Sequence, residues 1–419
     1  MTSPRWNEAD QEMFHWLLPL FLSGAAALPA EKKSPLPRAN NHEAANRERG
    51  DAPTNRPRRC VAATCARWLE AEIASRERDQ TLRVDPALEQ AALRHGLALL
   101  RRRAHGTLAH IQADLFAEGL ADAQVTPYAA IGAPLDGLAD ALLEFAAARV
   151  LRRGYTHMGI AVIDQGLRSA VVAFFVRRLI ELSPLPRVPL RPNHAVQGLV
   201  IRGDEIEAYV EHPGGWVEAL PVRRTRKRFT FTVPTAKPGH HRVEILVATE
   251  RGPEVAALWG FEIPSMGSEA KGIALKGPRD GPSKITREPG RDIHTTSDLF
   301  RAIEGLRRQG DLAPLARDAA LDKAAASFAG AVCAARIAAH VLPGQGGPVD
   351  RAQKAGYSRP VTENVAIAGS LDAAHRNLVQ SPSHLRNLID PAASYVGIGV
   401  ARDNTITPSV VCVVEIFGL

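Results

Sequence analysis

The stretch VTENVAIAGSLDAAHRNLVQSPSHLRNLIDPAASYVGIGVA, residues 361–401, constrains the fold of this 419-residue chain more than any other part. It places a Glu-Asn pair (Glu363 and Asn364), a Ser-Pro-x-His turn (residues 381–384) and a VGIGV segment in one compact order. The pattern predicts a helix after the Glu-Asn pair, ended by Pro391, and then a strand. Few folds need these features in this order.

These motifs resemble the CAP superfamily, also called the SCP domain, which contains cysteine-rich secretory proteins, antigen 5 proteins, plant pathogenesis-related proteins and many bacterial secreted proteins. Upstream segments agree in order. They are GDLAPLARDAALDKAAASFAGAV (residues 310–332), similar to the opening helix of the family, IAAH with its His340, and RAQKAGY (residues 351–357). The resemblance covers residues 292–419. It implies an α+β fold, a three-layer α-β-α sandwich with VGIGV and VVCVVEIF in the central sheet and residues 321–339 in one helical layer.

The resemblance also implies a cleft lined by His340, Glu363 and His384, next to Asn364 and Ser381. Two imidazoles and a carboxylate suit a borderline-soft cation whose shell water completes, and the family implies Zn held by His340 and His384. The same residues could do acid/base work, with Glu363 as the catalytic base. A structural role is the third alternative, in which His340 caps a helix and Glu363 holds backbone amides.

Other residues near this cleft are not predicted to act as catalytic groups or ligands. The second acidic residue of animal and plant members falls near Gln380 or Ser381, so this chain offers a triad. Ser381 and Ser383 lack the Gly-x-Ser-x-Gly setting of an exposed nucleophile. Asp372 and His375 lie one turn apart, which predicts a surface pair. Asn387 and Asp390 are predicted to fix the following turn through bonds to the backbone.

The N-terminal half repeats the C-terminal pattern at a separation of about 230 to 240 residues. RVDPALEQAAL (residues 83–93) parallels ARDAALDKAAA, VTPYAAIG (residues 125–132) parallels VTENVAIAG, and YTHMGIAVID (residues 155–164) parallels SYVGIGVARD. A degenerate duplicate of the same domain is the simplest interpretation. Its chemistry is lost: Pro127, Tyr128 and about Ala146 stand in place of Glu363, Asn364 and His384, and only His110 matches His340.

Between the two copies the hydrophobic period changes to two. IEAYV (residues 206–210), RFTFTV (228–233) and RVEILV (242–247) alternate apolar and polar residues between Gly- and Pro-rich turns. This predicts a small immunoglobulin-like sandwich. The predicted organisation is a candidate signal segment and disordered linker (1–59), the degenerate copy (60–188), the sandwich (189–264), a flexible linker (265–291) and the CAP-like domain (292–419).

The basic residues of the chain cluster most densely within the sandwich, at Arg223, Arg224, Arg226, Lys227 and Arg228. A solvated strand edge accounts for them better than a lipopolysaccharide or nucleic-acid patch, because such charges block edge pairing. The formal net charge is +7, and no nucleic-acid-reading motif accompanies it. Sequence-specific nucleic acid is therefore not an expected partner.

Cysteines and the N-terminus bear on the compartment. Residues 14–30 have the length and small-residue ending of a signal peptide, but an acidic flank, and no other stretch suits a membrane span. Export to the periplasm, cell envelope or exterior is favoured mainly by the resemblance. Cys60 and Cys65 could close a small loop, and Cys333 and Cys412 could be bridged or simply buried.

We therefore expect a secreted or envelope-associated binding protein whose cleft holds a divalent metal or small ligand, with an unidentified protein or an envelope or lipid ligand as partner. The alternative is a metal-assisted, peptidase-like hydrolase acting on extracellular or envelope substrates. Lipid or sterol carriage, as in some relatives, would need an apolar groove.

Overall fold

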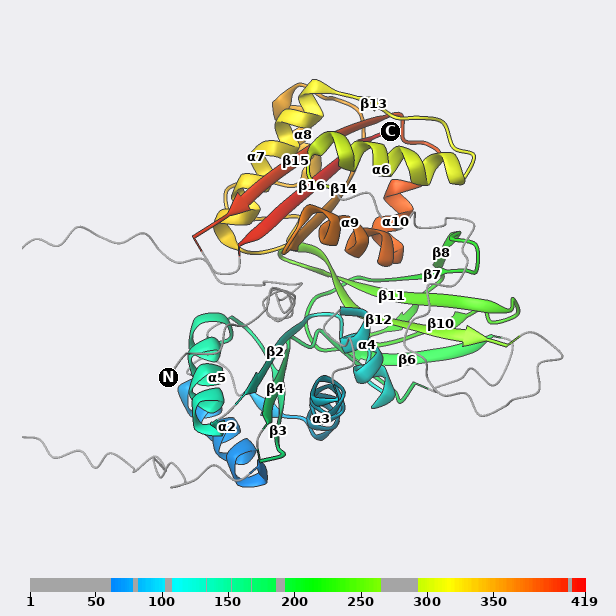
Figure 1. The fold of residues 1–419 in the computed structure, drawn as a ribbon. Helices are drawn as coiled ribbons and strands as arrows, with labels where there is room; N and C mark the ends of the chain where they lie inside the picture. Colours follow the sequence, from blue (N-terminus) through cyan, green and yellow to red (C-terminus); the bar gives the residue numbers. More distant parts are fainter. Residues whose placement is uncertain are drawn as a thin grey trace, which may run out of the picture.

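The computed structural model describes residues 62–77, 82–101, 108–132, 134–151, 153–166, 168–185, 193–264, 293–405 and 409–419. These residues form a mixed α+β structure in three units, with the all-β unit between two α+β units (Figure 1). The predicted signal segment and both predicted linkers lie outside the described residues. None of the helices in the described part is long and apolar enough to cross a membrane.

The C-terminal unit is built on one four-stranded sheet. Its strand order is β13 (Ala316–Arg317), β15 (Tyr395–Asp403), β16 (Val410–Gly418), β14 (Val361–Ala368). The β13–β15 pair is parallel and the other two pairs are antiparallel. One face packs on α7 (Ala319–Ala335) and α8 (Pro348–Ala355). The other packs on α6 (Thr296–Gln309), α9 (Leu371–Gln380) and α10 (Pro382–Leu388), so helices cover both faces.

Two glycines of the VGIGV strand explain how α7 lies so close to the sheet. A Cβ atom on Gly397 would come within 2.1 Å of the backbone carbon of Leu321, and one on Gly399 within 2.1 Å of that of Ala325. The helix begins at its N-cap Asp318, whose side chain accepts bonds from two backbone amides. It ends at Ala335, not at residue 339 as expected, because Arg336 adopts a left-handed conformation with φ 56°.

The N-terminal unit has the same sheet topology. Its strands run in the order β1 (Arg83–Val84), β3 (His157–Asp164), β4 (Ser169–Val176), β2 (Val125–Gly132), again with one parallel pair and two antiparallel pairs. The helices are α2 (Ala62–Arg76), α3 (Pro86–Leu100), α4 (Leu108–Ala117) and α5 (Leu135–Arg149). A Cβ on Gly159 of β3 would come within 2.3 Å of Leu88 of α3, the same close approach as at Gly397.

The middle unit consists of two four-stranded sheets packed around one hydrophobic core. One sheet contains β5 (Ile180–Leu182), β6 (His194–Val200), β10 (Arg228–Val233) and β9 (Arg223–Thr225); the other contains β12 (Gly252–Ile263), β11 (Gly239–Thr249), β7 (Ile206–Glu211) and β8 (Val217–Leu220). The strand β5 comes from the predicted N-terminal region and pairs with β6. The basic cluster lies exposed at the β9 edge, as expected for a solvated edge.

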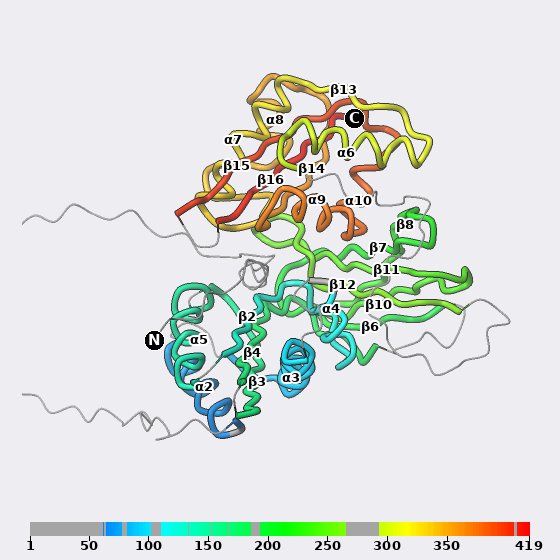
Figure 2. Tube along the Cα trace, viewed as in Figure 1, coloured from blue at the N-terminus to red at the C-terminus, as the bar shows by residue number. Residues whose placement is uncertain are grey.

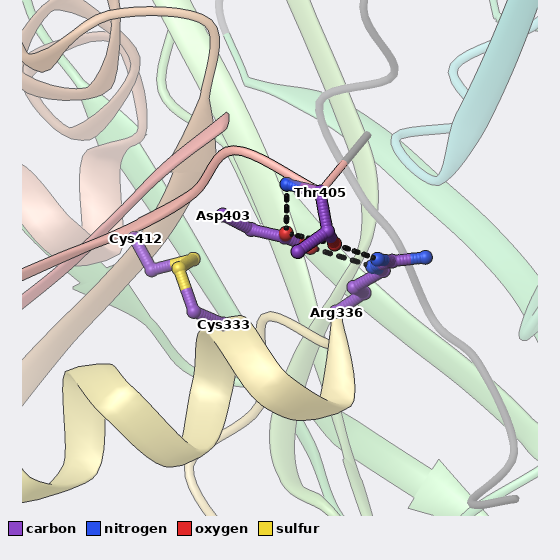
Figure 3. Close-up of a disulfide and its surroundings, with 5 residues drawn as sticks. All are labelled: Cys333, Arg336, Asp403, Thr405 and Cys412. Carbon is purple, nitrogen blue, oxygen red and sulfur yellow. Dashed lines mark hydrogen bonds and ion pairs between the residues drawn. A yellow bond between two sulfur atoms is a disulfide. The ribbon is translucent and has the colours of Figure 1, made fainter. Parts of the chain in front are cut away.

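A disulfide joins α7 to β16 within the C-terminal unit. Cys333 and Cys412 are bonded across 79 residues of sequence, beside a cluster in which Arg336 pairs with Asp403 at 2.7 Å and donates to Thr405 at 2.9 Å (Figure 3). Cys65 is also disulfide-bonded, and its sequence neighbour Cys60 lies outside the described residues. Of the two alternatives for Cys333 and Cys412, the structure contains the bridge.

Candidate functional site

The sandwich holds His340 in place through backbone contacts. After α7 ends, the amides of His340 and Val341 both donate to the carbonyl of Arg251, each at 3.0 Å. A Cβ on the next residue, Gly252, would come within 2.9 Å of the Cβ of His340. Only a glycine lets the turn between β11 and β12 approach this closely. The turn between β11 and β12 therefore packs directly against the segment that carries His340.

Glu363 lies behind His340 and is almost fully enclosed. Its Oε1 accepts a bond from Nδ1 of His340 at 2.9 Å, and its Oε2 pairs with Arg351 at 2.5 Å. The Glu363 side chain is 1% exposed and that of Arg351 is 7% exposed. The Arg351 guanidinium also lies 3.4 Å from the centre of the Phe328 ring. Because Glu363 accepts from both partners, His340 carries a proton on Nδ1 and its Nε2 is left for a ligand.

His384 lies in the first turn of α10, after the Ser-Pro step. Its Nδ1 is 2.6 Å from the hydroxyl of Ser381, which in turn contacts Oε1 of Glu244 at 2.6 Å. The other oxygen of Glu244 accepts the backbone amide of Ser383 at 2.7 Å. Burial, helped by the nearby His340, lowers the pKa of His384 to about 3, so this imidazole is neutral at physiological pH.

The Asn of the Glu-Asn pair connects the two halves of the site. Asn364 donates from Nδ2 to the carbonyl of His384 at 3.2 Å and to Glu415 at 3.0 Å, and its Oδ1 accepts from Asn387 at 2.9 Å. Asn387 also reaches the carbonyl of Glu363 at 3.3 Å. The network ties β14 to α10 and so sets the position of the His384 backbone.

The two imidazoles share a small pocket at the meeting point of the three units. Their ring centres are 6.5 Å apart and their planes differ by 28°. The pocket has about 30 Å³ open to water-sized molecules, which is room for about two waters. Its lining also includes Gln124 from the N-terminal unit and Glu254 from the sandwich. Glu254 is held by Arg177 and Gln124.

The donor set fits an open cation site with two protein ligands. Each histidine has its Nδ1 bonded to an oxygen, the arrangement that orients metal-binding imidazoles in proteins. Two imidazoles on one tetrahedral Zn place their ring centres roughly 5 Å apart, so these rings would have to approach by about 1 Å. In the described part of the chain no group of three or more His, Cys, Asp and Glu side chains is placed to hold a metal. Water would therefore have to complete the shell.

All five residues predicted for the cleft lie in one connected network, but they do not all face the pocket. His340 and His384 line it, whereas Glu363 supports His340 from behind. Three important partners were not predicted. Arg351 was visible within RAQKAGY, and Glu415 stands out as the one charged residue of VVCVVEIF. No signal pointed to Glu244, because its strand belongs to another unit.

Two predictions about neighbouring polar residues have different outcomes. The surface pair of Asp372 and His375 is wrong, because His375 is buried against the sheet side of α9 and burial lowers its pKa to about 4. Asp372 instead pairs with Arg376. The turn prediction holds for Asp390, whose carboxylate accepts the amide of Ala392 at 2.9 Å.

We expect Glu415→Gln to remove a pH dependence of stability. Burial raises the pKa of Glu415 from 4.5 to about 7. The folded domain thus retains a proton that the unfolded chain releases, so this stabilisation is complete below about pH 4.5 and is lost as the pH rises to about 7, by roughly 3 kcal/mol in all. Unfolding free energies of β16 amides from hydrogen exchange, compared between variant and wild type at pH 5 and pH 8, test this.

The buried histidines His375 and His384 have lowered pKa values, so their contribution to stability is lost as the pH falls, opposite to that of Glu415. Both proteins contain these histidines, so their contribution cancels in the difference between variant and wild type. A difference between variant and wild type that is the same at both pH values would contradict a neutral buried Glu415.

Comparison with known proteins finds similarity over part of the chain. The model of the cysteine-rich secretory protein family, CAP, matches residues 300–415. A search of curated proteins found no match. Among solved structures, an outer surface protein of Borrelia burgdorferi is 29% identical, over 31% of this chain and 97% of that chain, with a TM-score of 0.26.

Two further solved structures are similar to this chain. An extracellular SCP-domain protein of Bacillus anthracis is 14% identical, over 53% of this chain and 81% of that chain, with a TM-score of 0.26. A cysteine-rich secretory protein of Staphylococcus aureus is 13% identical, over 54% and 77%, with a TM-score of 0.24. Residues 300–415, which contain the network from Glu363 to His384, are therefore similar to the CAP family.

Proposed function

We propose that this protein is a secreted or envelope-associated binding protein, and that His340 and His384 hold a divalent metal, with Zn the best fit, or a small polar ligand. The observation that carries the proposal is the pair of imidazoles on one small pocket, each anchored at Nδ1 by an oxygen. This anchoring leaves Nε2 of each ring for the ligand. A bound cation would act as a Lewis acid or as a bridge to a partner.

Two observations support export. The cysteines in the described part of the chain, Cys65, Cys333 and Cys412, are all disulfide-bonded. Disulfides persist in oxidising compartments and are rare in the cytosol. The matched family model is that of secretory proteins.

We also propose that the N-terminal unit is a degenerate second CAP domain and that the sandwich is an immunoglobulin-like module. The shared strand order and pairing of the two α+β sheets support the first. In matching register, Val125 pairs with Val176 and Val361 pairs with Gly418, so Pro127 and Tyr128 occupy the positions of Glu363 and Asn364. Ligand binding is therefore assigned to the C-terminal copy.

The geometry favours binding over hydrolysis. Glu363, the candidate base, has both oxygens engaged and a side chain that is 1% exposed. Ser381 is central in the chain Glu244–Ser381–His384, whereas a catalytic triad needs the histidine in the middle. The pocket of about 30 Å³ is also too small for a sterol or lipid tail.

Titration calorimetry on the full chain tests this function. We expect the wild type to bind one Zn, and His340→Ala or His384→Ala to weaken binding at least 100-fold, because a single imidazole with water cannot replace two. His294→Ala, at an exposed position before α6, is the matched control and should bind like wild type. Unchanged affinity in both cleft variants, or no binding by the wild type, would refute the metal site.

A further inference from the structure

The second histidine of the pocket is positioned by a residue from outside the CAP domain. Glu244 comes from β11 of the sandwich, 137 residues before Ser381 in sequence, and is fully buried at the contact with α10. Figure 2 shows α10 lying over β11 and β7. Neighbouring contacts keep the two units in register: Arg242 donates to the carbonyl of Gln380 at 2.8 Å, and Arg386 reaches the hydroxyl of Tyr209 at 3.3 Å.

Hydrogen-bond roles along Glu244–Ser381–His384 are coupled, because Ser381 has a single hydroxyl proton. Burial raises the pKa of Glu244, whereas the hydrogen bonds from Ser381 and Ser383 and the nearby Arg242 act in the opposite direction and favour the carboxylate. A carboxylate can only accept, so Ser381 must donate to it. The Ser381 oxygen then acts as acceptor toward His384, and Nδ1 of His384 must carry the ring proton. A neutral imidazole has one N–H, so Nε2 is left with its lone pair.

We infer that Glu244 sets the tautomer of His384 through Ser381, and that the sandwich thereby completes the ligand pocket of the CAP domain. Glu244 is a positioning residue, since it does not touch His384 itself. It does for His384 what Glu363 does for His340: an acceptor behind Nδ1 leaves Nε2 facing the pocket. The consequence for cation binding rests on the proposed function, whereas the tautomer does not.

The variant Glu244→Gln tests this inference because it keeps the shape of the side chain and reverses the direction of its hydrogen bond with Ser381. The Ser383 amide needs an acceptor, which places the oxygen of the new amide there. The NH₂ group then faces Ser381 and donates to it. Ser381 should then donate to Nδ1 of His384 at 2.6 Å rather than to the more distant hydroxyl of Ser383 at 3.3 Å. The ring proton of His384 should move to Nε2, which can no longer bind a cation without losing that proton.

Long-range proton–nitrogen NMR spectra of the His384 ring in the full chain provide the direct readout. In wild type we expect the proton on Nδ1 and in Glu244→Gln on Nε2, with Zn affinity lowered 10- to 100-fold. Glu262→Gln, a 61% exposed side chain on the adjacent strand β12, is the matched control and should change neither. Ser381→Ala should remove the coupling, so that adding Glu244→Gln in that background leaves the His384 nitrogens unchanged.

A wild-type His384 protonated on Nε2, or a proton that stays on Nδ1 in Glu244→Gln, would overturn the inference. These outcomes are separable from failure of the metal site. A wild type that binds no Zn, yet whose tautomer flips in Glu244→Gln, refutes the proposed function and supports the role of Glu244. If Zn binding is lost in His384→Ala but Glu244→Gln changes neither Zn binding nor the tautomer, the metal site is supported and the role of Glu244 is refuted.

Discussion

Glu363→Ala is expected to lower the free energy of unfolding of the C-terminal domain by about 3 kcal/mol. The substitution leaves the guanidinium of Arg351 buried without its carboxylate, and breaking a buried ion pair from one side costs about 3 to 5 kcal/mol. The lower end applies because Arg351 keeps the carbonyl of His340 at 3.0 Å and the ring of Phe328. Hydrogen exchange at β14 and β16 amides gives the domain-specific free energy.

A double variant distinguishes the cost of leaving one charge unpaired from the cost of losing side-chain volume. Glu363→Leu with Arg351→Met removes both charges together, and similar replacements in other proteins are neutral or stabilising. We therefore expect it to recover most of the loss. A cost below about 1 kcal/mol for Glu363→Ala would contradict a buried ion pair between Arg351 and Glu363.

Removing the disulfide should have an effect of similar size. Cys333 and Cys412 close a loop of 79 residues, for which the chain-entropy model gives about 4.5 kcal/mol, and measured losses are about 2 to 5 kcal/mol. The N-terminal unit supplies the matched replacement. By the common register, Leu100 and Ala170 occupy the same two positions, and they pack in one hydrophobic cluster.

The variant Cys333→Leu with Cys412→Ala thus keeps an apolar pair and removes the cross-link. We expect it to lower the unfolding free energy measured from β15 and β16 amides by about 2 to 4 kcal/mol under oxidising conditions. With reductant present, the wild type should fall to the level of the variant. Equal stability of the two proteins under oxidising conditions would show that the cross-link contributes nothing.

Much of the fold follows from local pattern. Asp318 and Asp85 are N-caps that start α7 and α3, and the alternating residues of RFTFTV form β10. Local signals are less reliable where a helix ends. The left-handed Arg336 is not a glycine, so nothing in the sequence separated α7 from the segment that carries His340.

The candidate site could likewise be predicted in part from the sequence. The residue types and spacing of His340, Glu363 and His384 indicate the chemistry of two imidazoles near a carboxylate, and their motif order indicates that they converge. Which nitrogen of each imidazole is left for a ligand depends on the hydrogen-bond partner of the other nitrogen. The partner of His340 lies in the same domain, so the motif includes it.

The partner that orients His384 could not be found this way. Glu244 alternates with Val243 and Ile245, which predicts a side chain on the outer face of a sandwich, and an outer-face Glu is expected to meet water. Docking of β11 on α10 instead buries it against Ser381. Periodicity along a chain reports which side of a strand a residue occupies, whereas what covers that side depends on how separate domains pack.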